Sequence, residues 1–420
     1  MACNMRCKHC GSSCTDALPG ELTTLEAFKF IDMCKDIGLK WISLSGGEPF
    51  VRPDLLLLMK YLERNDIPAN ILTNGWLITE PMVKELSNIR NIRVSISLDG
   101  PKNVHDRMRR EGSFEKAIES YKLLKKYGMQ TGCTTTLTKE NLGNLDELYE
   151  TLVNLNIDIW QFQLGLPMGN LEKNKNLLIE PSDLLKFIDF FHEKALEKKI
   201  RIYPADCIGY YGKKVDDMLK LAYGVENAPV WSGCNAGKHS FGILHNGDIV
   251  GCTSIRDKKY VEGNIKERTL REIWEDPNSF SWNRKFNAKN LKGDCHNCEY
   301  AKRCLGGCAN TRLTTNGTFD SENLYCTHNL FLKKERQEEK SKKSLEDKEL
   351  PKVSGGFGGI GVNIDAYGMV EPDREEIVSN DYGNVMPYPE KSINVEQKID
   401  MWANIENSNN NFNFNPHFKK

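Results

Sequence analysis

The sequence predicts an α/β fold with helices between parallel strands over residues 1–205, followed by a small cysteine-rich domain. Apolar segments in the first part alternate between strand-like runs and helix-like periodicity. Fourteen cysteines are many for 420 residues, and most lie near the N-terminus or between residues 234 and 326. Strand–helix alternation favours a parallel sheet, either open or closed into a partial barrel.

The predicted elements follow one another in a regular order. The first helix covers residues 22–39, with Thr23 or Thr24 as its N-cap. A short buried strand at 41–45 comes next. Further strands are predicted at 70–73, 92–97, 130–137, 157–164 and 200–203, and further helices at 54–64, 80–87, 114–126, 145–155 and 181–198. Ligands of such sheets bind beyond the carboxyl ends of the strands, so residues following each strand are candidate site residues.

The rest of the chain has few long periodic segments. Residues 206–231 are predicted to be a connector, and 232–331 a domain that metal ligation could stabilise, with one helix at 270–275. The charged run 332–353 predicts a helix extension or a solvated linker. The glycine- and asparagine-rich segment 354–420 predicts a flexible tail.

Charge and hydropathy exclude several classes of protein. The formal net charge is −1, so neither nucleic acid nor an anionic membrane is an expected partner. The sequence has no apolar run of about 18 residues and no signal-peptide core at its N-terminus. We therefore expect a cytoplasmic protein, in which clustered cysteines indicate metal ligation rather than disulfides.

The first cysteine cluster consists of Cys3, Cys7 and Cys10, with the spacing C-x3-C-x2-C. Thiolates are soft ligands that suit iron–sulfur clusters. Three cysteines on one loop can hold three corners of a cubane and leave one iron open for chemistry. The alternative is a zinc site with Cys14 as fourth ligand.

Three short motifs each follow a predicted strand. They are Gly46-Gly47-Glu48-Pro49, Thr73-Asn74-Gly75 and Ser97-Leu98-Asp99-Gly100. Hydroxyl, amide and carboxylate groups can bind ribose hydroxyls or an ammonium group. Alternatively, the first motif is a turn with a capping glutamate and the others are ordinary turn chemistry.

Together, the cysteine triplet and these motifs resemble the radical S-adenosylmethionine (SAM) superfamily, in particular its peptide-modifying branch. The resemblance implies a partial (β/α)6 TIM-like barrel in which a reduced [4Fe–4S] cluster cleaves SAM to a 5′-deoxyadenosyl radical. It also implies that SAM contacts residues of the three motifs (Gly46, Gly47, Glu48, Pro49, Thr73, Asn74, Ser97 and Asp99), with residues 167–170 bordering the adenine. Members have a strand before the cysteine loop. Only Met1 and Ala2 precede Cys3, so that first strand is expected to be missing.

The second cysteine array resembles the SPASM domain of radical SAM maturases. Its members are Cys234, Cys252, Cys295, Cys298, Cys304, Cys308 and Cys326. The resemblance implies two auxiliary [4Fe–4S] clusters, one held by Cys234, Cys252 and Cys308, the other by Cys295, Cys298, Cys304 and Cys326. A zinc ribbon is the alternative, because both share the C-x2-C unit.

Two positions in this array differ from relatives of the resembled family. Ser240 stands where some have a further cysteine, which implies an open iron at the first auxiliary cluster. Thr253 stands where sulfatase-maturing relatives have an aspartate, which argues against that activity. Among the remaining cysteines, Cys34 and Cys133 are expected in the core.

The predicted function is radical oxidation of a peptide or protein, with a thioether or carbon–carbon crosslink as a possible product. One alternative is a small-molecule substrate such as a tetrapyrrole, and another is a non-catalytic iron–sulfur or zinc-binding protein. An external electron donor such as flavodoxin or ferredoxin is implied. The tail contains Tyr382-Gly383-Asn384 and Trp402-Ala403-Asn404, triplets that resemble crosslinked sites and suggest a substrate-like segment.

Overall fold

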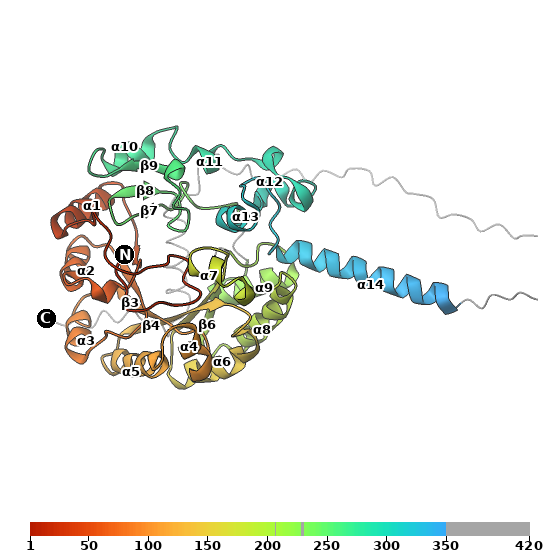
Figure 1. Ribbon diagram of the computed structural model, residues 1–420, viewed down its shortest axis with the longest axis horizontal. Coiled ribbons are helices and arrows are strands. Elements are labelled where there is room, and N and C mark those ends of the chain that lie inside the picture. Colours follow the sequence, from red (N-terminus) through yellow and green to blue (C-terminus); the bar gives the residue numbers. More distant parts are fainter. Residues whose placement is uncertain (206, 228–230, 350–420) are drawn as a thin grey trace, which may run out of the picture.

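The computed structural model describes residues 1–205, 207–227 and 231–349 (Figure 1). The predicted tail at 354–420, with both aromatic-X-Asn triplets, lies outside these residues, as do positions 350–353 of the predicted linker. In the described part of the chain, no helix combines the length and apolar character needed to cross a bilayer.

Six parallel strands form the main sheet, and their spatial order is their chain order. They are β1 (Ile42–Leu44), β2 (Ala69–Thr73), β3 (Ile92–Ser97), β4 (Gln130–Leu137), β5 (Ile159–Leu164) and β6 (Arg201–Pro204). Right-handed crossovers between neighbouring strands place the helices on one face, and Figure 1 shows them around the outside. Because β1 and β6 are the sheet's edges, the barrel is partial, as predicted.

The helices on the outer face confirm the predicted order. They are α1 (Thr24–Asp36), α2 (Leu55–Arg64), α3 (Glu80–Leu86), α5 (Ser113–Lys126), α6 (Leu145–Asn154) and α8 (Asp183–Glu197). Thr23 is the N-cap of α1 and forms a capping box with Glu26. Two short helices were not predicted, α4 (Lys102–Met108) and α7 (Asn170–Lys173), and both lie beyond the carboxyl ends of strands.

Side chains alternate across the sheet as the strand period requires. Ile71, Val94 and Trp160 are fully buried against the helices. The inner face carries polar side chains such as Asn70 and Ser95, and a largely apolar cavity of about 350 Å³ opens at the amino ends of the strands, lined also by Trp41 and Ile159. This cavity lies at the end of the sheet opposite the predicted motifs.

The segment predicted as a connector contains helix α9 (Lys213–Tyr223). Val215, Met218 and Ala222 recur at helical spacing and are buried. The helix packs against α8 and β6. This apolar stripe is short and interrupted by charged residues, which explains why the sequence pattern did not indicate a helix.

The second domain is small and irregular. A three-stranded antiparallel sheet, β7 (Gly242–Ile243), β8 (Asp248–Val250) and β9 (Val261–Asn264), is followed by α10 (Leu270–Glu275), α11 (Ser281–Arg284), α12 (Ala301–Cys304), α13 (Ala309–Asn316) and α14 (Thr327–Glu349). The charged run is thus the helix extension, and Figure 1 shows α14 projecting from the body.

The second domain contacts the barrel near both edges of the sheet. Lys266 forms an ion pair with Glu26 of α1 at 3.1 Å, and Tyr325 donates to the Ile179 carbonyl at 3.0 Å, just before α8. Between these contacts, the Arg256 guanidinium donates to Ser12 at 2.7 Å. The N-terminal cysteine loop therefore lies between the barrel and the cysteine-rich domain.

Candidate functional site

The three N-terminal cysteines lie together on one clamped loop. The thiols of Cys3 and Cys10 lie close enough to Cys7 to raise the pKa of its thiol. Asn170 holds the loop, since its side-chain amide donates to the Cys7 carbonyl at 2.9 Å and its backbone N–H donates to the Cys10 carbonyl at 2.8 Å. At Gly169, with φ +58°, an added Cβ would lie 2.5 Å from the Cys10 oxygen. Residues 167–170, expected beside the adenine, thus clamp the cysteine loop.

A buried network of charged side chains packs against this loop. The Asp99 carboxylate is completely buried and pairs with Arg109 Nε at 2.6 Å and His9 Nε2 at 3.2 Å. Its other oxygen accepts from the Thr136 backbone N–H at 3.1 Å. Burial acts to raise the pKa of Asp99, but Arg109 and His9 outweigh it and hold that pKa well below its usual value. Asp99 is therefore a carboxylate in this network.

The same network brings a cation to the thiols. Arg109 Nη1 lies 4.0 Å from Cys7 Sγ. Burial raises the pKa of the Cys7 thiol to about 11, and Arg109 opposes this shift. A guanidinium beside a thiolate stabilises the anionic ligand that an iron–sulfur cluster needs. Arg109 was not among the predicted site residues, although it lies only ten residues after Asp99, in the segment 105–110 that is rich in basic residues.

This geometry shows which protein groups Asp99 contacts. Both carboxylate oxygens accept from protein donors, and the side chain has no exposed surface. Asp99 orients Arg109 and His9 beneath the cysteine loop. Its contact with SAM stays a prediction.

Glu48 joins two of the predicted motifs. Its buried carboxylate accepts from Thr73 Oγ1 at 2.6 Å, the Asn74 N–H at 2.8 Å and the Phe50 N–H at 3.1 Å. The last contact caps the 3-10 helix Pro49–Val51, so the turn with a capping glutamate is present here. Burial raises the pKa of Glu48, although these hydrogen bonds act in the opposite direction.

The local backbone explains why glycine stands at both positions before Glu48. A Cβ on Gly47 would lie 1.9 Å from the Ala2 carbonyl oxygen, which accepts from the Glu48 N–H at 2.8 Å. Gly46 has φ +127°, and its carbonyl accepts from the Cys14 thiol at 3.3 Å. The backbone of residues 1–2 thus packs against Gly47, and the expected approach of the SAM methionine stays a prediction.

The remaining predicted SAM residues lie at the carboxyl ends of the strands, on the same side of the sheet as Glu48. Asn74 donates to the Asn4 side chain at 2.7 Å, and Pro49 is buried at the start of its 3-10 helix. Ser97 ends β3 on the inner face and is partly exposed. Near Cys3, this edge offers a carboxylate, amides and a hydroxyl, which fit the ammonium and hydroxyl groups of SAM.

Four cysteines of the second array form one group. Burial raises the pKa of the Cys326 thiol to about 12, with further contributions from the neighbouring thiols of Cys295 and Cys298. Cys304 is likewise influenced by all three. Loop residues and the ends of α12 and α14 supply these thiols, so the structure places the predicted second auxiliary set together.

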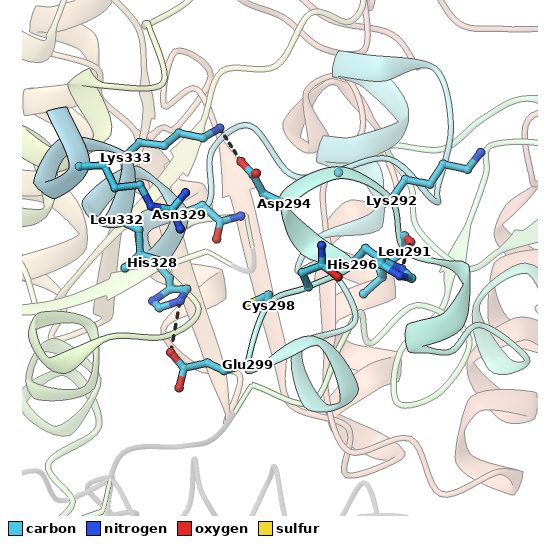
Figure 2. Close-up of a pocket in the computed structure, with 13 residues that line it drawn as sticks. Leu291, Lys292, Asp294, His296, Cys298, Glu299, His328, Asn329, Leu332 and Lys333 are labelled. Atoms are coloured by element: carbon cyan, nitrogen blue, oxygen red, sulfur yellow. Dashed lines mark hydrogen bonds and ion pairs between the residues drawn. The ribbon is translucent and has the colours of Figure 1, made fainter. Parts of the chain in front are cut away.

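One thiol of this group lines a surface pocket of about 910 Å³ (Figure 2). Cys298 belongs to the loop 291–299 and lines the pocket that this loop forms with the start of α14. Ion pairs bridge the same two segments, Lys333 with Asp294 at 2.6 Å and His328 with Glu299 at 3.6 Å. This side of the cysteine group therefore faces the solvent.

The cysteines of the other predicted auxiliary set come from three separate segments of the second domain. Cys308 is the N-cap residue of α13, and its N–H donates to the Tyr210 hydroxyl at 3.1 Å. The Cys234 carbonyl accepts from Asn283 at 2.8 Å, and Cys252 follows β8. The thiols of Cys234 and Cys308 both act to raise the pKa of Arg312.

The ligand geometry bears on the zinc alternatives. Among the residues that the structure describes, no three His, Cys, Asp or Glu side chains converge closely enough to hold a single metal ion. The thiols of Cys10 and Cys14, the fourth ligand of the zinc alternative, lie within hydrogen-bonding distance of each other, which raises the pKa of Cys14. Cys34 and Cys133 are buried core residues, as predicted.

Comparisons with known proteins agree with this geometry. Residues 1–152 match the radical SAM superfamily and residues 234–299 an iron–sulfur cluster-binding domain, SPASM. The AdoMet-dependent heme synthase of Methanosarcina barkeri is 30% identical over 336 residues, covering 78% of this chain and 93% of the relative. The mycofactocin maturase MftC of Mycobacterium tuberculosis is 27% identical, covering 77% and 80%.

A solved structure shares the fold. Streptococcus suis SuiB bound to S-adenosylmethionine superposes with a TM-score of 0.61 at 18% identity, over 77% of this chain and 74% of SuiB. The extent of the match to the heme synthase, together with both domain matches, shows the family. The chain therefore belongs to the radical SAM superfamily, with a SPASM iron–sulfur domain, and its cofactors are [4Fe–4S] clusters and SAM.

Proposed function

We propose that this enzyme abstracts a hydrogen atom from a peptide or protein substrate and that two auxiliary clusters take part in the oxidation. The contact of Arg109 with Cys7, on a loop that faces the SPASM domain, carries the proposal. Bound together, the N-terminal cluster and SAM supply the 5′-deoxyadenosyl radical. The substrate is then expected between the cysteine loop and the second domain.

The residues of the chain orient and shield this chemistry. Arg109, fixed by Asp99, compensates the negative charge of the thiolates. Ser97 and Asn74 are suited to hold SAM at the carboxyl ends of β2 and β3. Asn170 keeps the cysteine loop closed against the barrel, which limits the access of water to a reactive radical.

A tetrapyrrole is the second candidate substrate. The observation in its favour is the 30% identity with a protein named AdoMet-dependent heme synthase over nearly its whole length. The relative named mycofactocin maturase matches at 27%. The family relationship is compatible with both classes of substrate. An external flavodoxin or ferredoxin and a cytoplasmic location remain predictions.

Substrate-dependent SAM cleavage tests the proposal. The anaerobically reconstituted enzyme is incubated with SAM and dithionite, and with either a synthetic peptide pool or an iron-containing coproporphyrin. Formation of 5′-deoxyadenosine and loss of substrate hydrogen are followed by mass spectrometry. The variant Cys7→Ala is the control, because it lacks one ligand of the radical-generating cluster.

Each result has a clear meaning. Peptide-dependent deoxyadenosine with a peptide that has lost hydrogen supports the first candidate. A change confined to the porphyrin supports the second. About 12 irons per chain are expected from three cubanes, and stoichiometric zinc with little iron would overturn both.

A further inference from the structure

Arg312 is a buried cation on α13 that the proposed chemistry does not yet use. Its side chain is only 1% exposed, and its Nε has no hydrogen-bond partner. One Nη donates to the Phe319 carbonyl, and the guanidinium lies 4.9 Å from the centre of the Phe286 ring. None of these contacts supplies a negative charge.

A buried guanidinium needs compensation, because removing a charge from water is strongly unfavourable even after the protein has relaxed around it. Burial lowers the pKa of Arg312, and the thiols of Cys295, from one auxiliary set, and Cys234, from the other, oppose this shift. A cluster with thiolate ligands is anionic, so two bound clusters would supply the missing charge.

Residues near Cys308 surround the side chain of Arg312. Arg312 follows Cys308 by one helical turn, and its N–H donates to the Cys308 carbonyl at 3.3 Å. Gly306, at φ +78°, leaves space for it, since a Cβ there would lie 2.9 Å from Arg312 Cζ. Asn323 donates to the Gly306 carbonyl at 3.2 Å and to the Tyr210 hydroxyl at 3.3 Å. The guanidinium thus lies beside Gly306, one helical turn from Cys308, and the thiols of Cys295 and Cys234 are near enough to raise its pKa against the effect of burial.

We propose that Arg312 is the shared counter-ion of the two auxiliary clusters and raises the reduction potential of both. The inference rests on the proposed presence of those clusters. Reduction adds a negative charge to a cluster, and a fixed cation in a poorly solvated site stabilises the reduced form. Arg312 is a positioning residue in this scheme, because it acts on the substrate only through the clusters.

The test is a potentiometric titration followed by electron paramagnetic resonance on the full-length reconstituted chain. Arg312→Met removes the charge and keeps a side chain of similar length. In a Cys7→Ala background, without the N-terminal cluster, the auxiliary signals are read alone. We expect both auxiliary midpoints to move to more negative values, while Arg312→Lys stays near the unchanged protein.

Arg109→Met is the matched control, since it removes a buried arginine beside the first cluster instead. It is expected to shift the N-terminal midpoint and leave the auxiliary midpoints in place. Unchanged auxiliary midpoints in Arg312→Met, or an equal shift in Arg109→Met, would overturn the inference.

Iron content separates the remaining outcomes. If Arg312→Met loses auxiliary iron and Arg312→Lys retains it, the charge is needed and the counter-ion role is supported. If both variants lose it, the role of Arg312 is one of shape and the inference is wrong. If the unmodified chain binds no auxiliary cluster, the proposed function itself fails, independently of Arg312.

Discussion

Replacing Asp99 with asparagine tests the buried network under the first cysteine loop. Asp99→Asn keeps the size of the side chain and an acceptor for the Thr136 N–H, but removes the charge opposite Arg109 and His9. The acid is fully buried, so solvent screens little of the interaction. Breaking a buried pair by removing one partner costs about 3–5 kcal/mol, and we expect a loss of unfolding free energy of this size.

The assay is urea unfolding of the anaerobic protein at neutral pH, followed by circular dichroism. Glu85→Gln is the matched control, because Glu85 pairs with Lys60 at 2.9 Å on the exposed surface. A pair of that kind is worth about 0–1 kcal/mol. Equal losses in the two variants would refute the importance of the buried network.

The pH dependence gives a second check. Since the folded-state pKa of Asp99 is lowered, its ionised form stabilises the fold above the unfolded pKa of about 4. That contribution disappears as the pH falls through the folded-state value. The difference in stability between the unchanged protein and Asp99→Asn should therefore shrink in acid. A difference that grows as the pH falls would contradict the assigned charge.

The cysteine groups and the glycine turn lead to three further predictions. Cys7→Ala should lower iron from about 12 to about 8 per chain and abolish deoxyadenosine formation; full iron in this variant would exclude Cys7 as a ligand. Cys326→Ser should weaken the second auxiliary cluster while SAM cleavage persists, as iron analysis and product assays will show. Gly47→Ala should lower both thermal stability and SAM affinity, because its Cβ would lie 1.9 Å from the Ala2 oxygen; an unchanged melting temperature would show that the N-terminal residues move aside at no cost.

Local patterns predicted most of the barrel correctly. The strands at 92–97 and 130–137 have the predicted bounds, because the first alternates apolar and polar residues and the second is rich in threonine. The helix α9 was missed, since its buried stripe is short and only packing against α8 and β6 stabilises it. The short helices α11, α12 and α13 were missed for the same reason, whereas α10 has the predicted bounds.

Residue roles in the site were harder to predict than residue identities. Asp99 was singled out from its motif, but its pairing with Arg109 depends on how helix α4 packs against the cysteine loop. Asn170 reaches Cys7 from a position 163 residues away in the chain. No local pattern contains such contacts, so a carboxylate that binds a ligand and one that orients an arginine look alike in the sequence.

The cysteine spacing, the order of the strands and the family could all be inferred from the chain's residues, because soft ligands at close spacing and repeated strand–helix units are local properties. Which charges are buried together became known only from the folded molecule. Its packing places Arg109 at Cys7 and buries Arg312 one helical turn from Cys308. The physical reason is that desolvation and charge pairing depend on the distances between segments far apart in the chain, which are set only when the barrel and the second domain pack.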